Sequence, residues 1–166
     1  MSGQIYQDGL FISTGNVETV SEAAPFSAGQ LGKTITIDEK TFRYVKRHSS
    51  GAINTQYFGV VWQDRANNIV TVAASAMPYA GIFLGDDDAA DTSVRGMALS
   101  QYGYIQTAGP ATIQSGAAFA KGAGLMLELT TGKFITATAG NPIVAIALAV
   151  AGGADAATAV QLIPVS

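Results

Sequence analysis

Short apolar or alternating segments follow one another along most of the chain, and helical periodicity is hard to find. Gly, Pro, Asn, Asp and Ser bound these segments at spacings of about 8–12 residues, which is the signature of an all-β protein. In Thr34–Asp38, threonine and isoleucine alternate with period two, as expected of a half-buried strand. The pattern therefore predicts an all-β fold with helix below about 15%.

The expected strands follow from the same pattern. They are Thr34–Asp38, Thr41–Lys46, Tyr57–Gln63, Ile69–Ala74, Gly81–Leu84, Met97–Ser100, Gly103–Thr107, Leu125–Leu129, Phe134–Ala137, Ile143–Val150 and Ala159–Pro164. The stretches "IDEKTF" (37–42) and "LTTGKFI" (129–135) predict hairpins, the second with Gly132 at positive φ. Gly109 and Pro110 are expected to turn the chain after the strand at 103–107.

The first 25 residues differ from the rest, because their apolar residues follow no clear period and a polar stretch ends in Pro25. A frayed leader and an arm that docks on a neighbouring subunit both fit, and the cluster "LFI" favours the arm. We expect an extended N-terminal arm over 1–25 and a compact β-sandwich or β-barrel-like domain over 26–166. The candidate interface residues of the arm are Ile5, Tyr6, Leu10, Phe11 and Ile12.

Composition narrows the class of partner. Of the 166 residues, 13% are charged, about half the usual share, and mean hydropathy is +0.27. Such a surface is typical of a protein that other protein covers. The net charge of −3 argues against nucleic acid, whose phosphates need clustered cations. The apolar run Pro142–Ala154 is shorter than the ~20 residues of a membrane helix, and the N-terminus does not resemble a signal peptide. We expect a soluble protein, made in the cytoplasm, that binds neither nucleic acid nor membrane.

No sequence motif in the chain identifies a catalytic reaction. Asp86, Asp87, Asp88 and Asp91 form the one carboxylate cluster, but "GDDDAADTS" lacks the glycine and terminal glutamate of an EF-hand loop. A solvated acidic loop is favoured over a calcium site. His48 is the only histidine, there is no cysteine, and nothing matches G-x-S-x-G, so His48 is interpreted as an exposed loop residue. We therefore expect no catalytic residue, no metal, no cofactor and no enzymatic activity.

Aromatic residues on the expected strands leave two interpretations open. Stacked on one exposed surface they would make a platform for sugars, whereas buried they would be ordinary core and cross-strand contacts, which is what aromatic residues on strands usually make. The core interpretation is favoured. The residues concerned are Tyr57, Phe58, Trp62, Tyr102 and Tyr104.

Four segments carry a family resemblance. They are "AGQLGKTITIDEKTFRYVKR" (28–47), "GMALSQYGYIQTAGPATI" (96–113), "FAKGAGLMLELTTGKFITA" (119–137) and "NPIVAIALAVAGGADAATAVQLIPV" (141–165). Together they resemble the capsid decoration, or cement, proteins of tailed bacteriophages. Ala145 stands where those proteins commonly have glycine, and neither residues 1–25 nor "GDDDAAD" has a close counterpart in them.

The resemblance implies a small, mostly β virion protein, commonly a trimer, on the exterior of the capsid. Its implied partner is the major capsid protein, whose neighbouring subunits it clamps, and no cofactor is implied. The alternative from a different class is a glycan-binding β module of a phage or surface structure, which would use the aromatic platform. Exposed aromatic residues beside a groove would favour this alternative, and buried ones would favour a cement protein.

Overall fold

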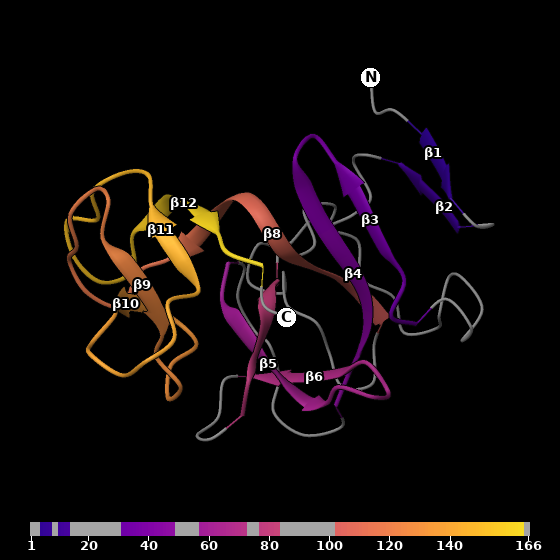
Figure 1. Ribbon diagram of the computed structural model, residues 1–166, viewed down its shortest axis with the longest axis horizontal. Coiled ribbons are helices and arrows are strands. Elements are labelled where there is room, and N and C mark those ends of the chain that lie inside the picture. The colour runs from indigo at the N-terminus through magenta and orange to yellow at the C-terminus, as the bar shows by residue number, and fades with distance from the viewer. Residues whose placement is uncertain are drawn as a thin grey trace.

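The computed structural model describes residues 4–7, 10–13, 31–48, 57–72, 77–83 and 102–164. Within these ranges 57% of the residues lie in strands and none in a helix, so the all-β prediction is confirmed (Figure 1). The strands are β1 (Gln4–Gln7), β2 (Leu10–Ser13), β3 (Thr34–Ile37), β4 (Lys40–Arg47), β5 (Gly59–Asp64), β6 (Ile69–Val72), β7 (Tyr79–Phe83), β8 (Tyr102–Gln114), β9 (Gly124–Leu127), β10 (Phe134–Thr136), β11 (Ala145–Ala147) and β12 (Ala157–Leu162).

Five strands close a barrel in the order β8–β7–β5–β6–β4, because β4 also pairs with β8. The β4–β6 pair is parallel, and the other four pairs of the barrel are antiparallel. β3 continues the sheet outward from β4. Closure gives every barrel strand a hydrogen-bonded neighbour on both sides and so makes a stiff unit. Of the two expected architectures, the barrel-like one is adopted.

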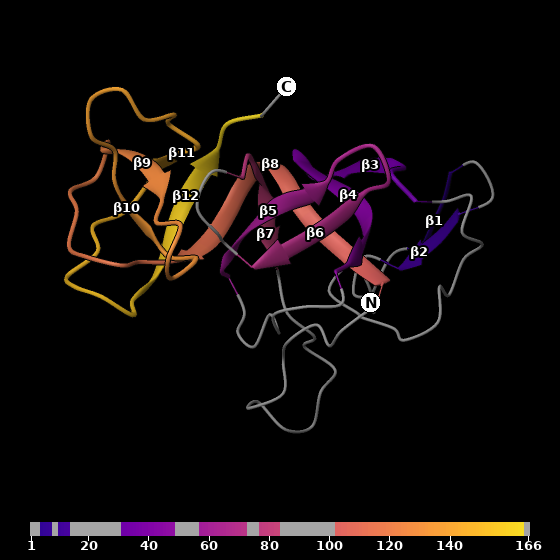
Figure 2. The same ribbon diagram turned by 90° about the horizontal axis from the view of Figure 1, so that it is seen from below.

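A second group of strands extends from the barrel through β8. From Gly109 to Gln114, β8 pairs with β12, and β11, β9 and β10 follow in that order. These four strands and residues 109–114 of β8 are called the C-terminal sheet below. Figure 2 shows it beside the barrel, with β8 running from one into the other.

β8 does not turn at Gly109 and Pro110, so that sequence prediction is wrong. The strand bulges where Thr41 and Phe42 of β4 face Ala108 and Gln106, and Gly109 then takes a φ of 92°. The buried side-chain amide of Gln106 donates to the carbonyl oxygens of Ala108, at 3.0 Å, and of Pro110, at 2.7 Å. One side chain thus bridges two carbonyl groups on either side of Gly109, which holds the irregular stretch together.

Both expected hairpins are confirmed. Ile37 pairs with Lys40, and Asp38 and Glu39 between them have positive φ of 48° and 67°, the conformation of a type I′ turn. β9 returns through β10, and Gly132 in their connection has a φ of 74°. Some strand boundaries differ: the expected strand at 143–150 shortens to β11, and the one at 103–107 lengthens to β8. The strand expected at 97–100 lies outside the described residues.

The apolar core has two parts. One cluster contains residues of barrel strands only, among them Val60, Val70 and Ile105. The larger cluster joins barrel residues such as Tyr44 and Ile82 to residues of the C-terminal sheet, which include Phe134, Leu125 and Leu162. Because this second cluster spans the two sets of strands, burial of its apolar surface holds the barrel and the C-terminal sheet together.

A glycine pair tests the importance of the β8 irregularity. A Cβ added at Gly109 would lie 2.1 Å from the carbonyl oxygen of Glu39, whereas one at Gly122, with a φ of 85°, would meet nothing within 4 Å. Gly122→Ala should therefore cost only the strain of positive φ, about 1–2 kcal/mol. Gly109→Ala adds overpacking against backbone and should cost about 2–5 kcal/mol. Urea denaturation of both variants measures the difference, and equal losses would contradict the close approach.

Candidate functional site

The five candidate residues of the N-terminal arm lie together in one hairpin. β1 and β2 pair antiparallel, which sets Ile5 opposite Ile12 and Tyr6 opposite Phe11, while Leu10 faces Gln7. This hairpin pairs with none of the ten strands of the main sheet. A sequence signal for this hairpin was present but was not used above: Asp8-Gly9, between the two strands, is a typical hairpin dipeptide.

The outer side of β11 and β12 forms an uncharged surface. Ile146 pairs with Gln161 of β12 and with Gly124 of β9, and the N–H of Leu148 donates to the carbonyl of Ala159 at 2.9 Å. Burial alternates along both strands, so the residues between the core positions point outward. We call this surface the C-terminal face, and it consists of Ile143, Ile146, Leu148, Ala157, Ala159 and Gln161.

Large apolar side chains are exposed on and beside the C-terminal face. Ile143 is 50% exposed and Leu148 44%, and Val150, which follows β11, is 67% exposed. Among residues 31–48, 57–72, 77–83 and 102–164 these three are the only large hydrophobic residues exposed to this degree. Exposed apolar residues that flank one strand on both sides, as these flank β11, are typical of a contact surface for other protein.

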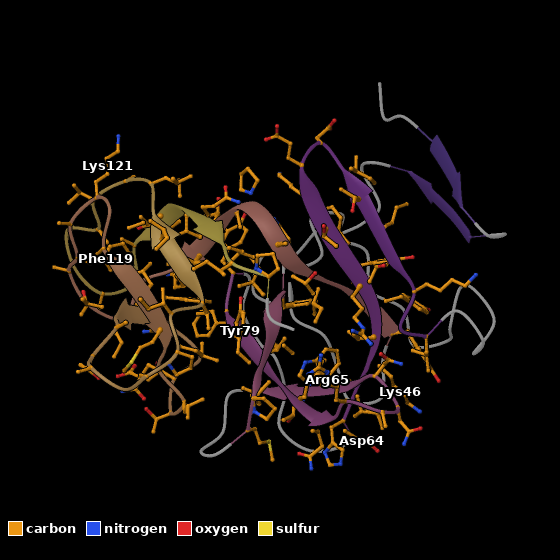
Figure 3. All side chains as sticks on the ribbon, in the orientation of Figure 1. Lys46, Asp64, Arg65, Tyr79, Phe119 and Lys121 are labelled. Atoms are coloured by element: carbon orange, nitrogen blue, oxygen red, sulfur yellow. The ribbon has the colours of Figure 1, made fainter. Side chains whose placement is uncertain are left out.

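The charged residues are divided unevenly between the two halves. Residues 102–164 carry four, of which Lys133 and Asp155 form an ion pair at 2.5 Å. The described part of 31–83 carries nine, which are Lys33, Asp38, Glu39, Lys40, Arg43, Lys46, Arg47, Asp64 and Arg65. Figure 3 shows Lys46, Asp64 and Arg65 around the barrel, away from the C-terminal sheet. The C-terminal face is therefore the charge-poor side of the molecule.

The aromatic residues do not form an exposed platform. Trp62 is 7% exposed and Tyr104 4%, so both belong to the core, as the favoured interpretation expects. Tyr57, Phe58 and Tyr102 are half-buried. A sugar stacks on the open face of a ring, and the buried rings offer no such face.

Cations also cover two of these rings. The guanidinium of Arg43 lies 5.0 Å from the centre of the Trp62 ring, and the ammonium of Lys46 lies 5.3 Å from that of Tyr102. Arg43 is held in place by two hydrogen bonds to the Oδ1 of Asn68, at 2.6 and 3.1 Å. Desolvation lowers the pKa of Arg43, and the neighbouring Arg65 lowers it further. The ring faces are thus used in cation–π contacts within the barrel.

Two buried tyrosines have hydroxyl groups with no hydrogen-bond partner among the described residues. They are Tyr79 and Tyr104. Burial raises the pKa of both above the ordinary value for a phenol, and Tyr44 adds to the effect at Tyr104. Both phenols are therefore neutral at physiological pH and are buried from solvent, so they fit packing rather than proton transfer.

His48 follows β4 and is half-buried rather than exposed, so the expectation of an exposed loop residue is wrong. Its backbone N–H donates to the carbonyl of Val70 at 2.8 Å, which continues the β4–β6 pairing and draws the residue against the barrel. The acidic segment from Asp86 to Asp91 lies outside the described residues. In the part of the chain that is described, no three His, Cys, Asp or Glu residues gather as metal ligands. No helix there is long and apolar enough to cross a membrane.

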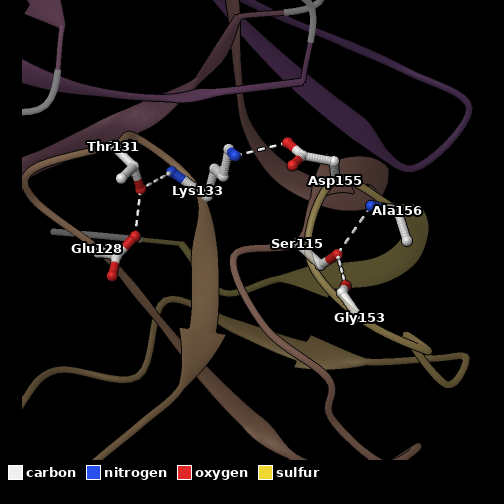
Figure 4. Close-up of polar contacts among 7 residues, drawn as sticks. All are labelled: Ser115, Glu128, Thr131, Lys133, Gly153, Asp155 and Ala156. Carbon is white, nitrogen blue, oxygen red and sulfur yellow. Dashed lines mark hydrogen bonds and ion pairs between the residues drawn. The ribbon is translucent and has the colours of Figure 1, made fainter.

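Ser115, at the end of β8, joins three segments of the C-terminal sheet (Figure 4). Its fully buried hydroxyl donates to the carbonyl of Gly153 at 2.6 Å and accepts the N–H of Ala156 at 3.0 Å. The N–H of Asp155 donates to the Ser115 carbonyl, and Lys133 binds the Asp155 side chain. The hydroxyl is thus engaged by backbone groups of the 153–156 turn, and its role is to fix that turn against β8 and β10.

Comparisons with known proteins add no family: no protein-family model and no curated protein matches this chain.

The Ser115 contacts generate a stability prediction. Ser115→Ala removes a buried donor and acceptor and leaves the Ala156 N–H without a partner, which should cost about 1–3 kcal/mol of unfolding free energy. The matched control is Thr138→Ala, whose exposed hydroxyl accepts a surface bond from Asn141 at 2.7 Å and donates a long one to the Met126 sulfur at 3.9 Å, and it should change stability by less than about 0.5 kcal/mol. Urea denaturation measures both. A Ser115→Ala variant as stable as the control would show that the turn does not depend on this hydroxyl.

Proposed function

We propose that this protein decorates a tailed-bacteriophage head and stabilises the capsid by bridging subunits of the major capsid protein. The particular family comes from the sequence resemblance of the segments 28–47, 96–113, 119–137 and 141–165 to cement proteins. The structure supports the broader part of the proposal, namely that this chain works by contact with protein. We place it on the exterior of the virion, as a homo-oligomer with a trimer favoured.

The observation that carries the proposal is the C-terminal face. Ile143 and Leu148 are about half exposed, and no charged residue lies among the members of the face. Depletion of charge together with exposed apolar side chains is what distinguishes the centre of a protein–protein interface from ordinary surface. Leaving such a surface in water is unfavourable, so it favours assembly.

The rest of the architecture suits a passive, stiff element. The barrel is closed, and the larger core cluster joins it to the C-terminal sheet. Ser115 and the aromatic residues serve packing and hydrogen bonding within the chain. A rigid body loses little conformational entropy when it binds, which leaves more of the contact energy for association.

Multiple attachment would supply the strength that one contact lacks. A standard interface buries about 1,600 Å², and apolar burial contributes about 25 cal/mol per Å² to the free energy of binding. Most of this free energy is offset by the translational and rotational freedom that the partners lose. In an oligomer that binds at several points, the later contacts are intramolecular, which raises avidity by roughly 10²–10⁴. This mechanism requires no reactive residue.

A glycan-binding module is the alternative that the sequence left open. It requires ring faces open to a sugar, whereas Trp62 and Tyr104 are buried and cations lie over Trp62 and Tyr102. These observations favour the decoration protein over the glycan-binding module.

Thermal release of DNA from phage heads tests the proposal. Heads assembled without this protein should release DNA at a lower temperature than decorated heads, because bridges between capsid subunits oppose expansion by the packaged DNA. A fluorescent dye that binds released DNA gives the temperature, and the control is to add purified protein back to bare heads, which should restore the higher value. Equal release temperatures with and without the protein would refute the stabilising role.

A further inference from the structure

We propose that the β1–β2 hairpin of one copy docks on the C-terminal face of a second copy. This contact deepens the function proposed above and takes its biological role from it, since it would hold the decoration oligomer together. The contact joins a hairpin that shares no ladder with the main sheet to an exposed face of that sheet.

The hairpin needs a surface to cover it. Its two strands have four residues each, and five of these eight residues are large and apolar. A two-stranded hairpin alone is marginally stable in water at best. It gains no support from strand pairing with the ten-stranded sheet, with which it shares no ladder. Burial against another apolar surface would supply the missing stabilisation.

The C-terminal face matches the hairpin in charge and polarity. Neither strand of the hairpin contains a charged residue, and its polar residues are Gln4, Gln7 and Ser13. The face likewise has no charge, with Gln161 as its one polar side chain. The barrel strands are a poorer partner, because the uncharged strands of the hairpin would have to desolvate charged groups such as Lys40 or Asp64 there. The C-terminal face also presents Ile143 and Leu148, two large apolar side chains that are exposed to solvent, so the hairpin fits it.

The positions of the two surfaces favour a second copy. In both Figure 1 and Figure 2 the hairpin lies beyond β3 at one end of the longest axis, and β9 to β12 lie at the other end, with the barrel between them. Residues 14–30 connect the hairpin to the barrel, and 17 residues span up to roughly 56 Å. This length lets the hairpin reach a neighbouring molecule.

Such a contact joins unlike surfaces, so it is heterologous. A heterologous contact repeats from copy to copy and closes into a ring when the rotation between copies allows it. Three copies related by 120° would use all three hairpins and all three C-terminal faces, which agrees with the favoured trimer. In a two-fold dimer, the hairpin of each copy would likewise cover the C-terminal face of the other. The mass of the oligomer in solution distinguishes a dimer from a trimer.

Disulfide trapping tests the contact directly, because the chain has no cysteine of its own. One full-length variant carries Phe11→Cys and another carries Leu148→Cys. When the two are mixed and oxidised, a cross-linked pair should form in greater yield than in either variant alone. Because the cysteines are on different chains, this product reports contact between copies only. In the control, Thr36→Cys, on the exposed part of β3, replaces Leu148→Cys and should give little cross-linked product.

Charge insertion provides the second measurement. Phe11→Asp and Leu148→Asp should each reduce self-association at least tenfold by light scattering, because each buries an unpaired charge in the contact, whereas Thr36→Asp should not. Circular dichroism verifies that the variants are folded. A monomeric wild-type protein, or a yield of cross-linked product with Thr36→Cys equal to that with Leu148→Cys, would overturn the proposal.

These outcomes are separable from the fate of the proposed function. If cross-linking succeeds but the purified oligomer does not bind bare heads, the contact stands and the decoration role fails. If the protein binds and stabilises heads while Phe11→Asp and Leu148→Asp self-associate normally, the decoration role stands and this contact is wrong.

Discussion

The whole arrangement depends on β8, the one strand shared by the barrel and the C-terminal sheet. Its first part pairs with β4 and closes the barrel. Its second part pairs with β12, and β11, β9 and β10 follow β12 in the sheet. The change of partner requires a bulge and a residue at positive φ, and Gly109 meets this requirement directly against the carbonyl of Glu39. The buried side-chain amide of Gln106 donates to the carbonyls of Ala108 and Pro110, on either side of Gly109.

This shared strand allows two chemically different halves to behave as one body. The barrel carries most of the described charge and uses some of it internally, as when Arg43 covers Trp62. The C-terminal sheet and its connections carry fewer charged residues, and Ile143 and Leu148 are exposed to solvent there. A rigid link between a charged, solvated half and an apolar, exposed half orients the molecule toward protein partners. The proposed decoration role depends on this asymmetry.

Local sequence patterns predicted the structure correctly where residues close together in the sequence determine it. The alternation in Thr34–Ile37 and the short turn at Asp38–Glu39 made β3 and its hairpin predictable. The turn predicted at Gly109 and Pro110 was wrong, because these two residues are a turn signal only in isolation. The close approach of Gly109 to Glu39 and the hydrogen bond from Gln106 to Pro110 keep them in a strand, and both contacts depend on tertiary structure. The C-terminal face was not predictable either. Which side of β11 is buried depends on its register with β9 and β12, and the local sequence does not predict that register.

We propose that this chain is a rigid scaffold that acts on the outside of a capsid through contacts with other protein. Cryo-electron microscopy of the assembled phage particle is the decisive measurement, because the barrel and its attached C-terminal sheet have a recognisable outline. Density of this shape is expected on the outer surface of the head, in contact with at least two major capsid subunits. Density of this shape at the tail, with none on the head, would contradict it.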